Sequence, residues 1–547
     1  MRQTIADHLT FLYGPRTAVA LEPRLRWVLA KYFPASGDGP TPRQALALTE
    51  RDAILITYAD QVRREGRPHL QTLGAFLEKH TSSVISAVHL LPFFPSSSDD
   101  GFSVVDYYAV DPSVGGWGDV ASLGGRFQLM FDAVFNHVSV QSEWFKAFLS
   151  DDPQTRTWFI TVDGDPDLSQ VVRPRALPLL TSFETAAGDR KVWTTFSADQ
   201  VDLNLHDPEV FLALTDVLMF YVARGARFIR LDAIAYLWKQ LGTPSIHLPQ
   251  THRVVQLWRS LLDLVAPRAM LITETNVPHR DNVSYFGDGS NEAQLVYNFA
   301  LPPLVLHSLS TGSAEALSRW ASSLTVPSSG VTFFNFLASH DGIGLNPARG
   351  ILTEAEISLL AGRAQKHGGL VSYKNNPDGS TTPYELNINY FDALSDPASR
   401  ASMETQIARF VVAHAVMLAM PGVPGIYFHS LFGSRGDRAG AESSGIPRRI
   451  NRQKLMEQDL DSDLADASSM RSRVLGGLKN LLASRQASSC FHPCAAHKVL
   501  DAGPHAFAIE RTSNDGRHSA VCLHNLCDQP VRAGGEMLGP YEVRWLL

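Results

Sequence analysis

Eight short apolar segments recur along the chain, and helical patterns separate most of them. The segments show no polar face, which is typical of strands buried on both sides of a parallel sheet. Strands of this kind need helices to cover the sheet, so the alternation favours an α/β fold. The eight segments are residues 53–59, 84–95, 127–137, 226–235, 269–276, 293–302, 331–341 and 422–430.

Eight strand-and-helix units match a (β/α)8 TIM barrel better than an open doubly wound sheet. An open sheet usually has a G-x-G-x-x-G turn after a strand, and this sequence has none. Two connections are too long for simple loops: residues 138–205 after the third strand and residues 342–405 after the seventh. Long loops at the carboxyl ends of barrel strands build active sites. We therefore predict a catalytic barrel with two insertions, domain B (138–205) and domain B′ (342–405).

The pattern changes outside the barrel. Residues 1–48 read as an N-terminal helical extension, and residues 49–467 hold the barrel. Residues 468–547 contain a helix and then short strands, which predicts a small C-terminal all-β domain. The cysteines of that region lack the tight Cys-x-x-Cys pairs of zinc ribbons, so free thiols are favoured over a zinc site. These cysteines are Cys490, Cys494, Cys522 and Cys527.

The charge and hydropathy of the chain exclude two classes of partner. A net charge of −7 without a basic stripe argues against nucleic acid. No apolar run approaches the roughly 18 residues that a membrane span needs. The opening residues, "MRQTIADHLTFLYG", lack the charged and apolar regions of a secretory signal. We expect a cytoplasmic protein whose partners are small molecules.

Polar side chains close several of the predicted strands. Arg230 and Asp232 stand in the fourth, an otherwise apolar strand, and their side chains point the same way because they are two residues apart. The carboxyl ends of barrel strands meet at one mouth, where these side chains are expected to converge. The set comprises Asp132, Asn136 and His137 in the third strand, Arg230 and Asp232 in the fourth, Glu274 in the fifth, and His340 and Asp341 in the seventh.

Three of these carboxylates, Asp232, Glu274 and Asp341, come from three different strands. Two carboxyls about 5–5.5 Å apart are what a retaining glycosidase needs, one as nucleophile and one as acid/base. Arg230 is expected to keep Asp232 ionised. Taken singly, the Arg230–Asp232 pair could be structural, His137 a hydrogen-bonded core histidine and Glu274 a cap. Their joint placement at strand ends favours catalysis.

The segments "DAVFNH", "FIRLDAIA", "ITETN" and "LASHD" resemble the four signature segments of the α-amylase superfamily, glycoside hydrolase family 13. The resemblance implies a barrel with Asp232 as nucleophile, Glu274 as acid/base and Asp341 as transition-state stabiliser. It also implies sugar contacts from His137, Arg230 and His340.

A narrower resemblance is to the sucrose phosphorylase subfamily, carried by "LITYADQ", "VRPRALPLL" and "PYELNINYFDAL". Within it, "SSDDGFSVVDY", "ITETNVPH" and "KNNPDG" look most like the glucosylglycerate phosphorylases. The match implies that Asp99 grips glucose and that Phe102 forms an aromatic platform. Arg448, in "RRINR", matches the arginine that pairs with that carboxylate. A closed pocket for one glucose fits exchange of a terminal glucosyl unit.

Two positions depart from ordinary sucrose phosphorylases. This chain has Tyr384-Glu385 in place of Tyr-Gln, and Glu274-x-Asn276 in place of Glu-x-His. Both lie where the acceptor is expected, which disfavours fructose as the leaving group. The resemblance implies reversible phosphorolysis of 2-O-α-glucosylglycerate to α-glucose 1-phosphate and D-glycerate by double displacement. Sucrose 6-phosphate, glucosylglycerol and sucrose stay open as alternative donors.

Phosphate has to approach a site that already holds three carboxylates, so cations in the loops must offset the repulsion. Arg173 and Arg175 flank Pro174, which restricts the backbone between them. The resemblance associates the second arginine of this segment with phosphate. Lys374 is a candidate contact for an anionic acceptor, or a solvated loop lysine. Glu385 is expected to repel such an acceptor unless a cation or hydroxyl intervenes.

Asn136 matches a position that binds structural calcium in true amylases, whereas sucrose phosphorylases are typically calcium-independent. We predict no metal and no cofactor, with inorganic phosphate as co-substrate.

A hydrolase or transglucosidase of the same superfamily is the nearest alternative function. A non-catalytic sugar-binding barrel is less favoured because such proteins tend to lose the catalytic carboxylates. The subfamily includes monomers and homodimers, and the sequence does not separate the two.

Overall fold

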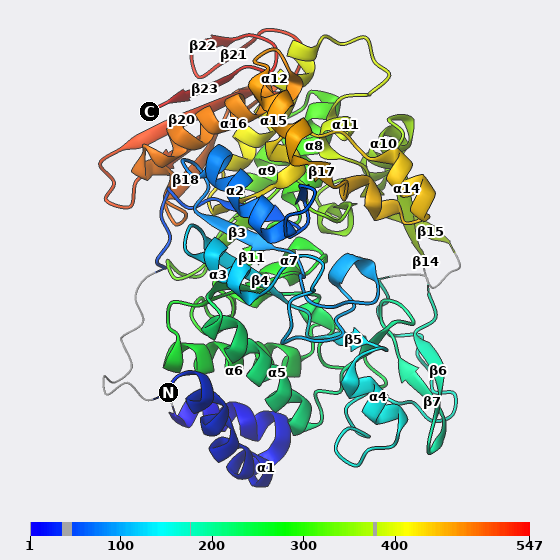
Figure 1. Cartoon of the computed structure of the whole chain (residues 1–547). Helices are drawn as coiled ribbons and strands as arrows, with labels where there is room; N and C mark the ends of the chain where they lie inside the picture. Colours follow the sequence, from blue (N-terminus) through cyan, green and yellow to red (C-terminus); the bar gives the residue numbers. More distant parts are fainter. Residues whose placement is uncertain (1, 35–45, 175–176, 376–379) are drawn as a thin grey trace.

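The computed structural model describes residues 2–34, 46–174, 177–375 and 380–547. Within them, eight parallel strands close into one barrel, which confirms the predicted fold class (Figure 1). The barrel closes where β16 pairs with β1. Its strands are β1 (Ile54–Thr57), β3 (Ala87–Leu90), β4 (Gln128–Ala133), β9 (Ala226–Leu231), β10 (Met270–Thr273), β11 (Leu295–Tyr297), β12 (Thr332–Asn335) and β16 (Val423–Tyr427).

Each barrel strand lies inside one of the eight predicted apolar segments, and nearly all strand residues are buried. The strands are shorter than the segments because the polar residues at the segment ends belong to the loops. Covering helices include α2 (His69–Thr81), α3 (Trp117–Gly124), α5 (Pro208–Ala223), α6 (Pro249–Val265), α8 (Leu301–Thr311), α9 (Glu315–Ser322) and α12 (Met403–Ala419).

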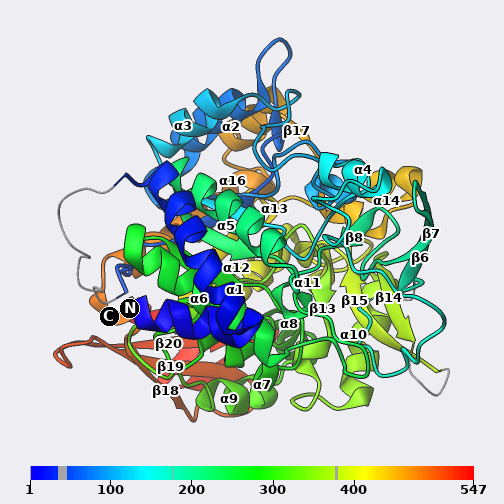
Figure 2. The same cartoon turned by 90° about the horizontal axis from the view of Figure 1, so that it is seen from below.

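Helix α5 begins where its sequence predicts. Asp207 caps it by accepting a hydrogen bond from the Glu209 backbone N–H at 2.9 Å, and Pro208 occupies the first helical position. Its side chains are buried over most of its circumference because α1 (Arg2–Tyr32) packs across α5 and α6 (Figure 2). Helix α1 is kinked at Gly14, whose φ of +78° suits glycine.

Both long connections contain structure of their own. The first connection contains α4 (Glu143–Leu149), β6 (Leu180–Thr185), β7 (Gly188–Trp193) and β8 (Gln200–Asp202), and β5 (His137–Ser139) begins one residue before the predicted insertion. Residues 342–405 contribute β13 (Ile343–Gly344), α10 (Glu354–Lys366), β14 (Leu370–Asn375), β15 (Thr381–Asn387) and α11 (Tyr390–Leu394). The β6–β7 and β14–β15 hairpins lie on the same side of the molecule in both views (Figures 1 and 2).

Beyond the barrel, α16 (Met470–Gln486) packs on α12 and leads into short strands. Four of these form an antiparallel sheet, in the order β18 (Ala496–Leu500), β19 (Ala506–Thr512), β20 (Ser519–Asn525) and β23 (Val543–Leu546). A small hairpin joins β21 (Val531–Ala533) to β22 (Glu536–Leu538). None of the four cysteines, all of them among the described residues, forms a disulfide. In the described part of the chain, every helix is too short or too polar to cross a membrane.

Candidate active site

A cavity of about 360 Å³ lies at the carboxyl ends of the barrel strands, between the two insertions. Its walls combine residues that follow β3, β4, β9, β10 and β12 with residues of the second insertion and of the "RRINR" segment. Strand ends far apart in sequence therefore meet as the barrel geometry predicts. Eleven of the predicted site residues line it: Asp99, Phe102, His137, Asp232, Glu274, Asn276, His340, Asp341, Tyr384, Glu385 and Arg448.

Arg230 lies beneath this cavity and is shared by three carboxylates. The register of β4 and β9 sets Arg230 opposite Asp132, and the two form a buried ion pair. Its Nη1 donates to Asp232 Oδ1 at 2.9 Å, while its Nη2 lies 3.9 Å from Glu274 Oε2. His89 Nε2 contacts the other oxygen of Asp132 at 2.7 Å. The Arg230 guanidinium thus lies within ion-pair distance of Asp132, Asp232 and Glu274, which come from three strands or their ends.

The sharing of Arg230 corrects the expectation that it simply keeps Asp232 ionised. Burial raises the pKa of Asp232 to about 8, because Arg230 only partly offsets it and Glu274 adds repulsion. Burial also raises the pKa of Glu274. Burial and mutual repulsion therefore disfavour the state in which both carboxyls are ionised, so the pair tends to keep one proton. Arg230 lies closer to Asp232 than to Glu274 and so favours an ionised Asp232, whereas the Ala233 backbone N–H favours an ionised Glu274.

The turn after β9 aims a backbone donor at Glu274. Ala233 has a left-handed backbone, with φ +49° and ψ +31°, and its N–H donates to Glu274 Oε2 at 3.0 Å. Such a conformation is strained for alanine and tends to occur at functional sites. It fixes the position of Glu274 relative to Asp232, the residue before the turn.

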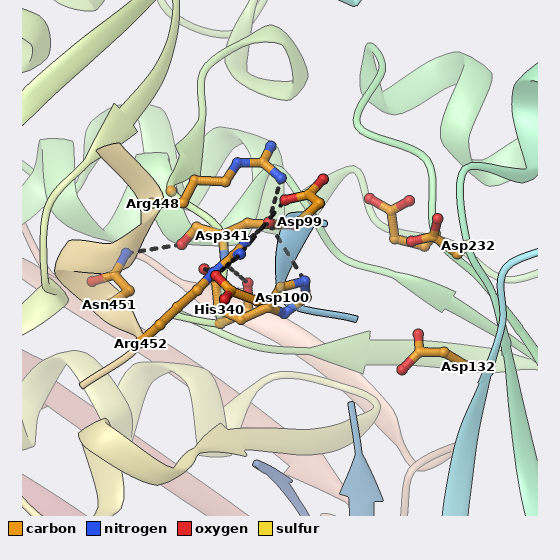
Figure 3. A network of polar contacts seen from close by, with 12 residues as sticks. Asp99, Asp100, Asp132, Asp232, His340, Asp341, Arg448, Asn451 and Arg452 are labelled. Carbon is orange, nitrogen blue, oxygen red and sulfur yellow. Dashed lines mark hydrogen bonds and ion pairs between the residues drawn. The ribbon is translucent and has the colours of Figure 1, made fainter. Parts of the chain in front are cut away.

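Asp341 lies in a cationic environment (Figure 3). Its Oδ1 is 2.6 Å from Arg448 Nη1 and 3.4 Å from Arg452 Nη2. Burial acts to raise the pKa of Asp341, but Arg448, His340 and Arg452 together hold it below its usual range. Asp341 is therefore ionised under conditions in which the Asp232–Glu274 pair keeps a proton.

Arg448 also pairs with Glu385, the carboxylate expected to repel an anionic acceptor. Its Nη2 donates to Glu385 Oε2 at 3.0 Å, and the Gly342 backbone N–H donates to Glu385 Oε1 at 2.6 Å. Both carboxylate oxygens of Glu385 thus face donors. Asp99, the partner expected for Arg448, is near enough to raise the pKa of that guanidinium. Arg448 also pairs with Asp341, so its charge offsets that of Glu385 only in part.

Phe102 and two histidines form another part of the cavity wall. The rings of Phe102 and His340 stack with centroids 4.7 Å apart and planes 6° apart. Burial lowers the pKa of His340 to about 3, so its ring is neutral. His137 Nε2 donates to the Phe102 carbonyl oxygen at 2.9 Å, as does Gln200 Nε2 at 3.0 Å. These contacts make a rigid aromatic platform with polar atoms at its edge.

Sequence reasoning missed several lining or supporting residues. Arg452 donates to the His340 carbonyl oxygen at 2.9 Å and to Asp100 Oδ2 at 2.7 Å. Its signal was its place in the same "RRINR" segment as Arg448. Tyr236 also lines the cavity and ends the short 3-10 turn Ile234–Tyr236 that follows Asp232. The other missed lining residues include Phe196, Gln200 and Phe299.

Of the residues predicted to contact the acceptor or phosphate, only some line the cavity. Asn276 packs against Gly344, where a Cβ would lie 2.6 Å from the amide oxygen. That oxygen is buried and has no hydrogen-bond partner among the described residues. Two predicted cations, Arg173 and Lys374, are not among the lining residues in the described part of the chain. Arg175 lies outside the described residues.

The loop geometry explains why these two cations lie elsewhere. Arg173 is exposed and donates to the Leu177 carbonyl oxygen, which turns its guanidinium back onto its own loop. Lys374 pairs with Thr382 across the β14–β15 hairpin, and its charged neighbours are Arg349 and Glu354. Neither orientation is encoded in the local sequence.

The possible calcium position near Asn136 already holds a cation from the chain. Lys239 Nζ donates to Asn136 Oδ1 at 2.5 Å and lies 2.7 Å from Asp202 Oδ2. All three residues are buried. The ammonium group lies between the oxygens that a metal ion would need, so these residues do not fit calcium. The described residues contain no other cluster of metal-binding side chains.

The chain matches the catalytic-domain model of the α-amylase family over residues 82–341. It belongs to that family, glycoside hydrolase family 13, and within the family it groups with the glycoside phosphorylases. It is 48% identical to the glucosylglycerate phosphorylase of Allomeiothermus silvanus over 100% of this chain and 99% of that protein. It is also 48% identical to the glucosylglycerate phosphorylase of Escherichia coli K12, over 96% of this chain and 92% of that protein.

Among solved structures, the fold resembles that of sucrose 6F-phosphate phosphorylase from Thermoanaerobacter thermosaccharolyticum. The TM-score is 0.76 at 24% identity, covering 89% of this chain and 96% of the other. The shared architecture therefore extends beyond the barrel to most of both chains.

Proposed function

We propose that this protein is a retaining glycoside phosphorylase that reversibly cleaves 2-O-α-glucosylglycerate with inorganic phosphate. The products are α-glucose 1-phosphate and D-glycerate. The observation that carries this proposal is the convergence of Asp232, Glu274 and Asp341 on one cavity. The full-length similarity to proteins named glucosylglycerate phosphorylase supports the choice of donor and acceptor.

The first step uses the single proton that Asp232 and Glu274 share. The ionised Asp232 attacks the anomeric carbon, and Glu274 donates its proton to the glycosidic oxygen as that bond breaks. D-Glycerate leaves, and a β-glucosyl ester forms on Asp232. Arg230 donates to Asp232 at 2.9 Å and thereby holds the attacking carboxylate in place.

The second step reverses these roles. A phosphate oxygen attacks the anomeric carbon of the glucosyl ester, Asp232 leaves as a carboxylate, and Glu274 accepts a proton from phosphate. Two inversions give α-glucose 1-phosphate with net retention. Asp341, held ionised by Arg448 and Arg452, hydrogen-bonds sugar hydroxyls and favours the oxocarbenium-like transition state.

The remaining roles follow from the resemblance and stay proposals. Asp99, Phe102, His137 and His340 hold glucose, and Asn276, Tyr384 and Glu385 face the acceptor. Phosphate contacts are assigned to Arg175 and Arg173, and glycerate to Lys374; for Arg173 and Lys374 this requires side-chain orientations other than those described. We propose no metal and no cofactor, a cytoplasmic location, and a monomer or homodimer.

The first experiment measures glucose 1-phosphate formation from four donors in parallel: glucosylglycerate, glucosylglycerol, sucrose and sucrose 6-phosphate. We expect a clear preference for glucosylglycerate. A preference for another donor would retain the phosphorylase and replace the acceptor. Glucose release that continues undiminished without phosphate would instead identify a hydrolase.

Replacing the nucleophile provides the matched test of mechanism. Asp232→Ala should abolish turnover with every donor, while circular dichroism shows an intact fold. Phosphorolysis that survives in this variant would overturn the assignment of the catalytic residues.

A further inference from the structure

The turn over residues 96–104, after β3, carries both Asp99 and Phe102. Asp99, Asp100 and Gly101 have consecutive left-handed φ angles of +52°, +48° and +112°. Glycine tolerates this region, but two successive aspartates in it are strained. Such a backbone persists only where its surroundings hold it. The contacts that hold the turn therefore decide where Asp99 and Phe102 lie.

Arginines of the "RRINR" segment hold one side of the turn (Figure 3). Arg449 Nη2 donates to Asp100 Oδ1 at 2.8 Å, and Arg452 Nη1 donates to Asp100 Oδ2 at 2.7 Å. Arg452 also donates to the carbonyl oxygen of His340, whose ring stacks on Phe102. This side of the turn is thus tied to the cavity wall itself.

Asp199, in the first insertion, holds the other side. Its Oδ2 accepts hydrogen bonds from Ser97 Oγ at 2.6 Å, from Ser103 Oγ at 2.8 Å and from Ser98 Oγ. The same Ser103 hydroxyl also lies 3.1 Å from the Asp199 carbonyl oxygen. Three hydroxyls on both flanks of the strained residues converge on one carboxylate oxygen. Hydrogen bonds to an ionised acceptor are stronger than neutral ones, so this contact is well suited to fix the turn.

We propose that Asp199 is a positioning residue for the glucose subsite. It is not among the residues that line the cavity in the described part of the chain, so it acts through the turn. By holding the serines on each flank, it keeps Asp99 and Phe102 placed before glucose arrives. The inference rests on the proposed function in that glucose is taken as the sugar of this subsite. It also gives a role to the "SSSDD" run, which the catalytic residues leave unexplained.

The test is the variant Asp199→Ala. We expect kcat/KM for phosphorolysis to fall by about 10- to 100-fold, since a displacement of roughly 1 Å in a catalytic site has an effect of this size. The dissociation constant of free glucose, measured by calorimetry, should rise by a similar factor, whereas the KM for phosphate should change less than twofold. A general loss of structure would not separate glucose from phosphate in this way.

Two further variants keep the test decisive. Ser98→Ala removes one of the three hydroxyls and should weaken glucose binding by about two- to fivefold without unfolding the protein. Asp165→Ala is the matched control, because Asp165 belongs to the same insertion and pairs with Lys191 at 2.6 Å on the surface. It should bind glucose as the wild type does.

Unchanged glucose binding in both Asp199→Ala and Ser98→Ala would overturn the inference. Equal weakening of glucose and phosphate would also overturn it. If the wild type binds glucose but forms no glucose 1-phosphate, the proposed function fails, and the glucose titrations still test the role of Asp199.

Discussion

Asp232 and Glu274 compete for one guanidinium, and this competition sets the response of the free enzyme to pH. Burial raises the pKa of both carboxyls, that of Asp232 to about 8. The first chemical step needs one proton on the pair. The pair keeps that proton below the raised pKa and loses it above. We therefore expect kcat/KM for phosphorolysis to fall as the pH rises through about 8, measured at saturating phosphate.

Glu274→Gln separates the two carboxyls. With α-glucosyl fluoride, whose leaving group needs no proton, this variant should still form the glucosyl-enzyme and should lose the alkaline limb. It should keep an acid limb, because Asp232 must still ionise. Asp232→Asn should be inactive with either donor. An alkaline limb that persists in Glu274→Gln would assign that titration to another group.

Gly342 allows Glu385 to approach the backbone closely. A Cβ at this position would lie 2.6 Å from Glu385 Cγ. Gly342→Ala should therefore displace Glu385 and the Arg448 that it holds, lowering kcat/KM by about 10- to 100-fold. Gly362→Ala, in α10, is the control because its Cβ would meet no atom within 4 Å. The control should keep full activity and gain slight stability from helix propensity. Equal activity in both variants would contradict the steric argument.

Lys239 joins the first insertion to the segment that follows β9. Its ammonium lies between Asn136 and Asp202, both buried. Lys239→Met leaves Asp202 without its counter-charge, and breaking a buried pair in this way costs about 3–5 kcal/mol. Urea unfolding should show a loss of that order. Lys146→Met, which removes a surface pair with Glu143, should change stability little. Stabilisation of the wild type by added calcium would contradict the role of Lys239 as the resident cation.

The strands could be predicted because both faces of a parallel barrel strand are buried, which leaves a continuous apolar run. Strand ends were predictable for the same reason: the run stops where the chain turns into the mouth. Asp232 and Glu274 were found in this way, since each is the first residue after its strand. In the segment 331–341 the end of the strand was predicted too late, because β12 ends at Asn335 and Asp341 lies in the loop after it.

Contacts between distant segments could not be predicted. Arg452 reaches Asp100 across 352 positions, and Lys239 reaches Asn136 across 103. The "RRINR" segment shows three arginines, yet only the packed loops decide which carboxylate each one meets. Arg173 differs, because its contact is local: its guanidinium donates to the Leu177 carbonyl oxygen, four residues on, rather than facing the cavity.

Although the chain is long enough for several domains, its largest apolar cluster extends from Ile5 to Tyr541. Side chains of α1, of the barrel and of the C-terminal sheet all belong to this cluster. Separate domains would bury separate cores and unfold in separate steps. We expect this core to make α1, the barrel and the C-terminal sheet unfold together.

Leu25→Ala tests this coupling from the periphery of the molecule. Leu25 is 2% exposed in α1, so its truncation should lower the free energy of unfolding by about 2–5 kcal/mol. The whole transition should move to lower temperature, with circular dichroism and activity lost together. Well below that transition kcat/KM should stay within twofold of wild type, because α1 contributes no residue to the cavity. Val19→Ala, at a position 75% exposed on the same helix, should leave the transition in place. An early loss of helical signal with activity retained would show instead that α1 unfolds independently.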